Sequence, residues 1–316
     1  MRVLDLGTAL GADPGDGPII AVGSAADIAS ERAQPLIEQA TFTLTEDPVD
    51  DRRVITVDSV TAATEDLARR IGRWPQAASV CDDVLRAVRP DAAAWTGVVT
   101  ESLAYSTLQA GPEFAAWLAA RGPASPPQTA DPVVAQRDGD VLHIWFNCPQ
   151  RHNAFANDMR RDLLDLLAVA QHDHSVQQVV VAGRGPSFCS GGDLAEFGSF
   201  ADPVSAHLAR TRHSPALALD ALAARLGERL VARVHGQVLG SGLEMAAFCG
   251  RVEAHPDCRI ALPEMSLGLL PGAGGTVSVT RRIGRWRTAY LVLSGQPVSA
   301  ETSLQWGLID AITMNG

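Results

Sequence analysis

Two carboxylates stand twenty residues apart in apolar surroundings, and residues of this type can carry out acid/base chemistry. Glu244 lies within LGSGLEMAAF, an apolar segment that predicts a buried helix, and Glu264 follows Pro263 at the end of a short predicted strand, RIALP. A buried carboxylate costs free energy unless it is paired or used. Two such groups facing one another can act on water and carbon, because one activates water while the other supplies a proton. A helix-capping role for Glu264 is the structural alternative.

Two glycine-rich loops could supply backbone N–H groups to a negatively charged oxygen. One lies in VVVAGRGPSFCSGGDLAEF, where we expect Asp193 to cap a helix, and the other in VARVHGQVLGSGLEMAAF. Gly191 and Gly192 let the backbone approach a ligand, and helix starts leave N–H groups unpaired at the positive end of the dipole. Together the loops could aim two N–H groups at one oxygen and stabilise a thioester enolate. A tight strand–helix turn is the structural alternative for each loop, and a phosphate loop is a poor interpretation because GxxxxGK[ST] is absent.

The elements that must position these groups alternate between strand and helix after residue 131. Apolar runs and periodicity predict strands over 140–146, 176–183, 230–236 and 259–263, and helices over 157–171 and 214–227. This alternation predicts an α/β core built from crossover units. Before it, strands are predicted over 3–7, 18–22, 41–45 and 52–57 around one helix at 27–40, and four helices at 64–74, 78–88, 100–108 and 112–121.

Composition sets the broad class. The 316 residues are 46% hydrophobic and 20% charged, which is typical of a globular chain with one large domain or two smaller ones. The net charge of −10 and the lack of a basic stripe argue against nucleic acid as a partner. Five cysteines without a CxxC pair, and eight histidines without HExxH, predict neither a disulfide framework nor a metal site. No signal peptide or membrane-spanning window is evident, so we expect a cytoplasmic protein.

Five motifs in order resemble the crotonase (enoyl-CoA hydratase/isomerase) superfamily. They are RHNAF, AGRGPSFCSGGD, HGQVLGSGLEMA, LPEMSLGLLPGAGGT and WGLID, and the resemblance covers about Asp131 to Ile312. It implies an α/β, crotonase-like (ClpP/crotonase) spiral of ββα units. It also implies an acyl-CoA thioester as substrate, no cofactor beyond the CoA of the substrate, and a homo-oligomer, either trimer or hexamer.

The resemblance also implies roles for single residues. The oxyanion hole falls on the N–H groups of Gly192 and Ser241, where many members have glycine in place of Ser241. In the hydratase branch, Glu244 would activate water and Glu264 would shuttle its proton to Cα, converting a 2-enoyl-CoA to a 3-hydroxyacyl-CoA. An isomerase that uses Glu264, and a non-catalytic acyl-CoA-binding or assembly subunit, are the alternatives. Further substrate-binding positions are Ser190, Gly191, Asp193, Leu194, Gly240, Gly242, Pro271 and Gly272.

The chain departs from the family pattern at both ends. Members normally continue past WGLID into helices that cover the acyl-CoA site, whereas this sequence stops at Gly316. The helical segment 54–122 resembles those helices, so we hypothesise a circular permutation, with an unrelated helical extension as the alternative. The expected organisation is a small α/β segment of unknown role at 1–53, the helical segment at 54–122, a proline-rich linker at 123–130 and the acyl-CoA-binding core at 131–316.

A cluster of arginines follows the glycine-rich PGAGG. It comprises Arg281, Arg282, Arg285 and Arg287. The spacing predicts a solvated helix face, and contact with the phosphates of CoA is the alternative.

Overall fold

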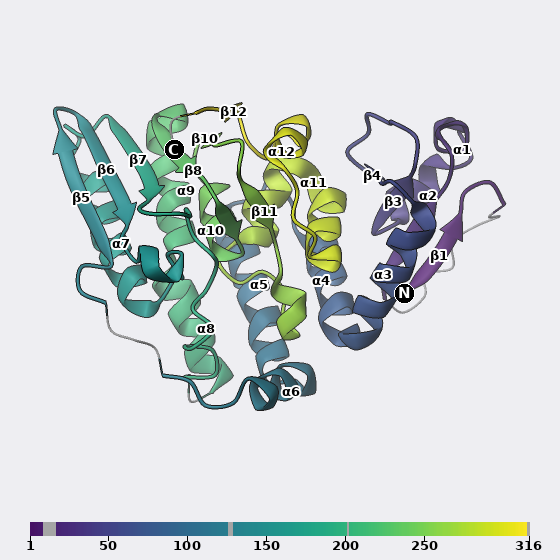
Figure 1. Cartoon of the computed structure of the whole chain (residues 1–316), viewed down its shortest axis with the longest axis horizontal. Coiled ribbons are helices and arrows are strands. Elements are labelled where there is room, and N and C mark those ends of the chain that lie inside the picture. Colours follow the sequence, from purple (N-terminus) through teal and green to yellow (C-terminus); the bar gives the residue numbers. More distant parts are fainter. Residues whose placement is uncertain (9–16, 126–128, 201, 315–316) are drawn as a thin grey trace.

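The computed structural model describes residues 1–8, 17–125, 129–200 and 202–314, which form three consecutive parts (Figure 1). A small parallel sheet with two short helices comes first, four helices follow it, and a larger α/β part contains the remainder. The predicted linker at 123–130 lies partly outside the described residues, which do not include 126–128.

The first part is a four-stranded sheet in the order β1-β2-β3-β4, with every neighbouring pair parallel. Its strands are β1 (Arg2–Asp5), β2 (Ile19–Val22), β3 (Phe42–Thr45) and β4 (Val54–Thr56), and its helices are α1 (Ala25–Ala29) and α2 (Gln34–Gln39). The single helix expected over 27–40 is therefore wrong. Pro35 begins a new helix in the first turn of α2, because its missing N–H is tolerated there and not in a helix interior. The sheet extends to Thr56, beyond the boundary expected at 53.

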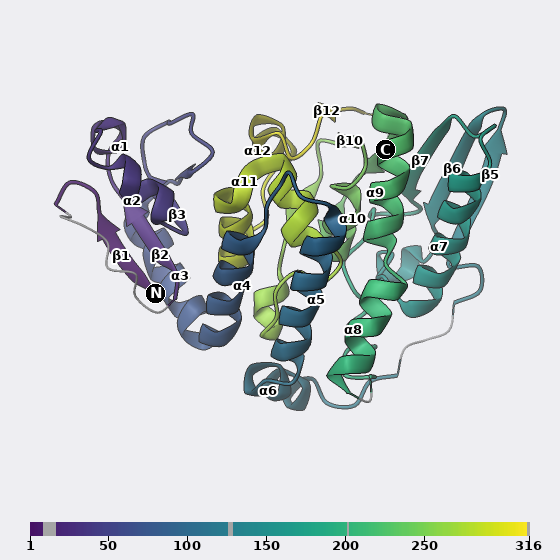
Figure 2. The ribbon, with the colours of Figure 1, turned by 180° about the vertical axis from the view of Figure 1, so that it is seen from behind.

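The second part consists of four helices that follow the predicted order. They are α3 (Val60–Arg73), α4 (Pro75–Ala87), α5 (Ala94–Gln109) and α6 (Pro112–Arg121). Their starts have local causes: the Ser59 side chain accepts from the N–H of Ala62, and Pro75 and Pro112 occupy first turns. Seen from behind, α4 and α5 lie across the middle of the molecule beside α11 (Figure 2).

The third part is built around a six-stranded sheet in the order β12-β10-β8-β7-β6-β5 and a two-stranded sheet of β9 and β11. All pairs are parallel except β5 with β6. The strands are β5 (Val133–Asp138), β6 (Val141–Phe146), β7 (Gln178–Gly183), β8 (Leu230–Val234), β9 (Gln237–Leu239), β10 (Arg251–Ala254), β11 (Arg259–Ala261) and β12 (Ala311–Ile312). The helices are α7 (Asn157–His172), α8 (Pro203–Arg212), α9 (Pro215–Leu226), α10 (Ser241–Ala246), α11 (Gly275–Ser294) and α12 (Ala300–Trp306), with 3-10 segments η1 (Pro149–Arg151), η2 (Gly227–Arg229) and η3 (Glu264–Leu267).

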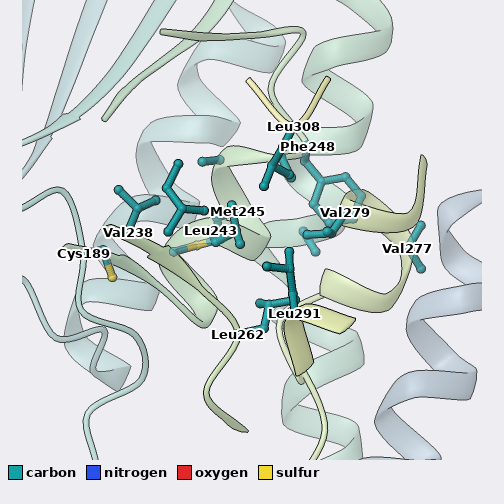
Figure 3. Packing of buried hydrophobic residues seen from close by; sticks show 14 of the residues in the cluster. Cys189, Val238, Leu243, Met245, Phe248, Leu262, Val277, Val279, Leu291 and Leu308 are labelled. Atoms are coloured by element: carbon teal, nitrogen blue, oxygen red, sulfur yellow. The ribbon is translucent and has the colours of Figure 1, made fainter. Parts of the chain in front are cut away.

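The short helix α10 lies within the apolar core. Its six residues are too few to be stable as an isolated helix. Leu243 and Met245 are each 2% exposed and lie among apolar side chains from every neighbouring segment, including Cys189, Val238 and Leu262 (Figure 3). Tertiary packing therefore holds the helix that contains Glu244.

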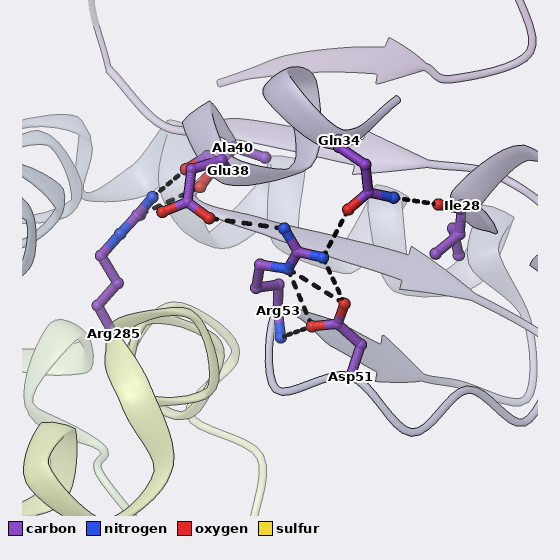
Figure 4. Close-up of polar contacts among 7 residues, drawn as sticks. All are labelled: Ile28, Gln34, Glu38, Ala40, Asp51, Arg53 and Arg285. Carbon is purple, nitrogen blue, oxygen red and sulfur yellow. Dashed lines mark hydrogen bonds and ion pairs between the residues drawn. The ribbon is translucent and has the colours of Figure 1, made fainter. Parts of the chain in front are cut away.

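The arginines of α11 hold parts of the fold together, so the predicted solvated face is wrong. Arg285 donates to the carbonyl oxygens of Glu38 and Ala40 at the C-terminal end of α2, and so attaches the first sheet to α11 (Figure 4). Arg281 pairs with Asp220 at 2.6 Å. The other two arginines also contact the protein. Arg282 donates to the carbonyl oxygens of Ala247 and Cys249, and Arg287 lies over the ring of Trp306.

All five cysteines are buried free thiols. Among the helices described, none is both long and apolar enough to cross a membrane. Within the described ranges, no group of three or more His, Cys, Asp or Glu side chains could hold a metal ion.

Candidate active site

Parallel pairing aligns the two glycine-rich loops. Cys189 N–H donates to the carbonyl oxygen of Gln237 at 3.1 Å, and Leu239 N–H donates to that of Cys189 at 3.0 Å. These bonds pair Cys189 with Val238, and Gly192 and Ser241, each three residues further along, line one cleft. Neither of those two N–H groups donates a hydrogen bond within the described part of the chain. Two free donors therefore belong to the same cleft, as an oxyanion hole requires.

A third segment supports the first loop from its other side. Phe155 N–H donates to the carbonyl oxygen of Gly191 at 2.8 Å, and Asp193 N–H donates to that of Phe155 at 3.0 Å. Arg151 forms a two-point ion pair with Asp193, with Nη2–Oδ1 at 2.7 Å. The helix expected after Asp193 is wrong: the chain turns there, and the Asp193 carboxylate accepts from the N–H of Ala195 at 3.0 Å as well as from Arg151. The carboxylate thus fixes a turn.

Glu244 is held against the start of α11. Its Oε2 accepts from the N–H groups of Ala273 and Gly275, both at 2.7 Å, and the residue is 2% exposed. A side chain at position 275 would meet Glu244, since a Cβ there would lie 2.6 Å from Glu244 Cγ. The glycine in PGAGG is therefore needed for this close approach.

Glu264 reaches the second loop from η3. A Cβ placed on Gly240, whose φ is +48°, would lie 2.4 Å from Glu264 Oε1. Glu264 is 9% exposed, and its Oε2 is buried without a hydrogen-bond partner among the described residues. One oxygen of this carboxyl group is thus available to a ligand.

A third buried carboxylate, Glu101 of α5, was missed in the sequence. Its Oε1 accepts from the N–H of Gly274 at 2.7 Å, and its Oε2 accepts from the N–H and Oγ1 of Thr276 at 2.9 and 2.7 Å. It is 1% exposed. A signal was present, because Glu101 lies at helical spacing with the apolar Val98 and Tyr105.

The three carboxylates line one cleft together with the two free N–H groups. Of the predicted positions, Gly192, Asp193, Ser241, Glu244, Glu264 and Gly272 line it. The remaining ones, Ser190, Gly191, Leu194, Gly240, Gly242 and Pro271, do not line it. Gly242 packs on Cys189, where a Cβ would come within 2.7 Å of the cysteine Cβ, and Leu194 is exposed to solvent.

The cleft favours protonated carboxyl groups. Burial raises the pKa of Glu264 well above its ordinary value, and the nearby Glu244 raises it further. Burial likewise raises the pKa of Glu244, although its backbone donors oppose the shift. The pKa of Glu101 is raised by burial first and by Glu244 second. Three groups with raised pKa values in one cleft are the pattern expected where protons are transferred.

Helix α5 forms a wall of this cleft and is attached firmly to α8. Val98, Glu101 and Tyr105 face the cleft from α5. Arg210 of α8 lies over the ring of Tyr105 at 4.5 Å and donates from Nη1 to Gln109 Oε1 at 3.0 Å. A helix that precedes the α/β core by sequence therefore completes the cleft within it.

Comparison with known proteins gives one consistent result. Residues 136–315 match a family model described as enoyl-CoA hydratase/isomerase. The chain is 33% identical over 180 residues to 2,3-dehydroadipyl-CoA hydratase of Escherichia coli (strain K12), which covers 57% of this chain and 68% of that protein. It is 31% identical over 195 residues to mevalonyl-coenzyme A hydratase SIDH of Beauveria bassiana (strain ARSEF 2860), covering 60% and 70% respectively.

Solved structures agree with the sequence comparisons. An enoyl-CoA hydratase from Thermoplasma volcanium GSS1 superposes with a TM-score of 0.51 at 31% identity, covering 59% of this chain and 73% of that one. An enoyl-CoA hydratase from Mycobacterium smegmatis gives a TM-score of 0.52 at 29% identity, covering 58% and 70%.

Proposed function

Because the chain belongs to the enoyl-CoA hydratase/isomerase family and has its crotonase-like fold, we propose that it adds water to a 2-enoyl-CoA by a two-glutamate mechanism. Its membership makes it an enoyl-CoA hydratase-like enzyme, a hydro-lyase acting on an acyl-CoA thioester. The observation that carries the mechanism is the meeting of two free N–H groups with two buried carboxyl groups in one cleft.

Each group has one task in the proposed reaction. The thioester oxygen accepts from the N–H groups of Gly192 and Ser241, which stabilise the negative charge of the enolate. Glu244, fixed through Oε2, holds and activates the water, whose oxygen bonds to Cβ. Glu264, with its partner-free Oε2, relays the proton that the water releases to Cα. The elements of one water molecule are thereby added, with no net gain or loss of protons.

Purified protein with crotonyl-CoA and longer 2-enoyl-CoAs tests this mechanism. We expect hydration, measured as loss of the conjugated enoyl thioester, to fall by roughly 10²–10⁴-fold in Glu244→Gln and in Glu264→Gln. The exposed Glu228→Gln variant serves as the control and should keep the parent rate. Hydration that survives both cleft substitutions would overturn the mechanism, and tight thioester binding without turnover would favour a binding or assembly subunit.

An isomerase is the second candidate, and one observation favours it. Oε2 of Glu244 is occupied by two backbone donors, whereas Oε2 of Glu264 has no partner among the described residues, so Glu264 alone could move a proton between carbons. A 3-enoyl-CoA substrate separates the two. Double-bond migration that persists in Glu244→Gln and stops in Glu264→Gln would establish the isomerase.

We also propose that α3 to α6 take the place of the helices that follow the core in other family members. The support is the position of α5, which contributes Val98, Glu101 and Tyr105 to the cleft wall. An acyl-CoA-bound structure tests this, and the expected result is contact between the ligand and α5. A ligand that leaves α5 untouched would favour an unrelated extension.

Three further features are proposed from the resemblance alone. They are a trimeric or hexameric assembly, a cytoplasmic location, and independence from any cofactor besides the CoA of the substrate. Light scattering tests the assembly, fractionation of cells tests the location, and the rate of exhaustively dialysed enzyme in the presence of a chelator tests the last.

A further inference from the structure

Four successive backbone N–H groups at the start of α11 are divided alternately between two carboxylates. Ala273 and Gly275 donate to Glu244, both at 2.7 Å. Gly274 and Thr276 donate to Glu101, at 2.7 and 2.9 Å. One turn of backbone, residues 273–276, is thus hydrogen-bonded both to α10, through Glu244, and to α5, through Glu101.

Hydrogen bonds from a helix start to a carboxylate are strong, because the first N–H groups have no acceptor within the helix. The first N–H groups of a helix have no partner within it, and they carry the positive end of its dipole. Helix α11 begins at Gly275 and is kinked at Gly284, and the hydroxyl of Thr276 adds a further donor to Glu101 at 2.7 Å. No Lys, Arg or His within the described ranges forms an ion pair with Glu101. The carboxylate is therefore satisfied by this turn alone.

Position connects Glu101 to Glu244, and charge connects it to Glu264. If residues 273–276 moved, the donors of Glu244 would move with them, since the two sets alternate along one stretch of chain. We propose that Glu101 is a positioning residue for the hydration: through the turn it fixes where Glu244 stands, and its negative charge in the same cleft helps Glu264 to keep its proton. This inference rests on the proposed function of that site.

The surroundings of Glu101 leave its charge unneutralised at short range. Four other acids line its cleft, namely Glu244, Glu264, Asp193 and Glu196, and like charge raises in part both its own pKa and that of Glu264. Arg210 of α8 and Arg160 of α7 also line the cleft, Tyr105 lies on the same helix as Glu101, and Cys81 lies on α4. Removal of the charge at 101 should therefore ease ionisation of Glu264.

Two substitutions separate position from charge. Glu101→Gln keeps the length of the side chain and removes its charge. One of its two terminal groups becomes an amide NH₂, which cannot accept a hydrogen bond from the N–H groups of residues 273–276. Glu101→Asp keeps the charge and is one methylene too short for the turn. We expect kcat to fall by roughly 10²-fold in both, since a displacement of about 1 Å costs about that much, with KM changed far less. Only Glu101→Gln should shift the basic limb of kcat/KM, which follows loss of the proton from Glu264, to lower pH.

Glu113 provides a matched control. It also caps a distant helix start, accepting from the N–H groups of Gln76 and Ala77 in α4 at 2.7 and 3.0 Å, but it does not line the cleft. Glu113→Gln should lose stability as Glu101→Gln does while keeping the parent pH profile. Equal rate and pH profiles in Glu101→Gln and Glu113→Gln would overturn the inference and leave the proposed function intact.

A second measurement does not depend on turnover. Carbon-13 NMR of labelled glutamate carboxyl groups, with Glu264 assigned from Glu264→Gln, follows the ionisation of Glu264 directly. The carboxyl of Glu264 should titrate at lower pH in Glu101→Gln than in the parent, and an unchanged titration would contradict the inference. Absence of hydration in the parent would instead reject the proposed function.

Discussion

Glu101, Glu244 and Glu264 are alike in burial and differ in the number of their hydrogen-bond donors. Glu101 accepts three hydrogen bonds and Oε2 of Glu244 accepts two, whereas Oε2 of Glu264 has no partner in the described chain. Hydrogen-bond donors stabilise the charged form of a carboxyl group, so a proton shared among the three resides preferentially on Glu264. The group that must deliver a proton to Cα is thus the one that the cleft keeps protonated.

The raised pKa of Glu264 predicts a stability that falls as pH rises. Between its ordinary value of 4.5 and its higher folded value, the folded state binds more protons than the unfolded state, so unfolding becomes easier with each step upward. We expect Glu264→Gln, which has no charge to bury, to be more stable than the parent above this window and similar below it. Urea midpoints measured across a pH series check this. A parent that is more stable than Glu264→Gln at every pH would contradict it.

Gly240→Ala should impair the site beyond its cost to the backbone. Its φ of +48° disfavours any side chain, and a Cβ there would lie 2.4 Å from Glu264 Oε1. Gly139→Ala is the control, because its φ is +60° and its Cβ would meet nothing within 4 Å. Both variants should lose about 1 kcal/mol of unfolding free energy from the left-handed backbone. Only Gly240→Ala should also lose hydration activity, and equal rates in the two variants would refute the contact.

At the scale of elements, periodic segments were predictable and short or polar ones were not. Helix α7 and strand β7 follow from clear apolar patterns. Strand β9 has three residues inside a glycine-rich loop, and α8 carries little apolar periodicity, so both were missed. Motif residues such as Glu244 could be found from the resemblance. Glu101 belongs to no such motif. Its helical spacing with apolar residues indicates burial, but its partners on Gly274 and Thr276 lie 173 and 175 positions away, so the sequence does not place it in the cleft.

Packing around α10 predicts a large cost for truncating its core face. Leu243 is 2% exposed and lies among side chains of the loops and of α11 (Figure 3). We expect Leu243→Ala to lower the free energy of unfolding by about 2–5 kcal/mol, because a cavity remains where the side chain was. Leu103→Ala, on the solvent side of α5 at 53% exposure, should change it by less than about 0.5 kcal/mol. Urea denaturation of both measures the difference, and comparable losses would contradict this account.

At the scale of the whole molecule, the first sheet lies at the opposite end from β5 and β6, and α11 lies next to the first sheet (Figures 1 and 2). Arg285 joins sheet and helix by donating to the carbonyl oxygens at the C-terminal end of α2, where a cation is also favoured by the helix dipole (Figure 4). Arg52 lies over the ring of Trp286 at 5.9 Å beside this contact. The first part is thus attached through α11 and not through the cleft.

Arg285→Met should loosen the first sheet without changing the cleft. Loss of hydrogen bonds from a charged donor costs about 1.5–3 kcal/mol. Hydrogen exchange over residues 19–56 should accelerate, while exchange in α10 and the hydration rate stay at parent values. Arg69→Met, which removes an exposed pair with Asp66 on α3, serves as the control and should leave exchange unchanged. Unchanged exchange over 19–56 in Arg285→Met would contradict this role.

The alternating hydrogen bonds of residues 273–276 also determine the stage of folding at which the cleft forms. Glu101 emerges from the ribosome long before its donors, since 173 residues separate it from Gly274. Contacts between residues so far apart in the sequence form late in folding, because closing the long loop between them costs conformational entropy before the contacts can stabilise the chain. A refolding chain should therefore regain its helical circular-dichroism signal first and its enzymatic activity afterwards. Helix α5 would form before residues 273–276 bind to Glu101.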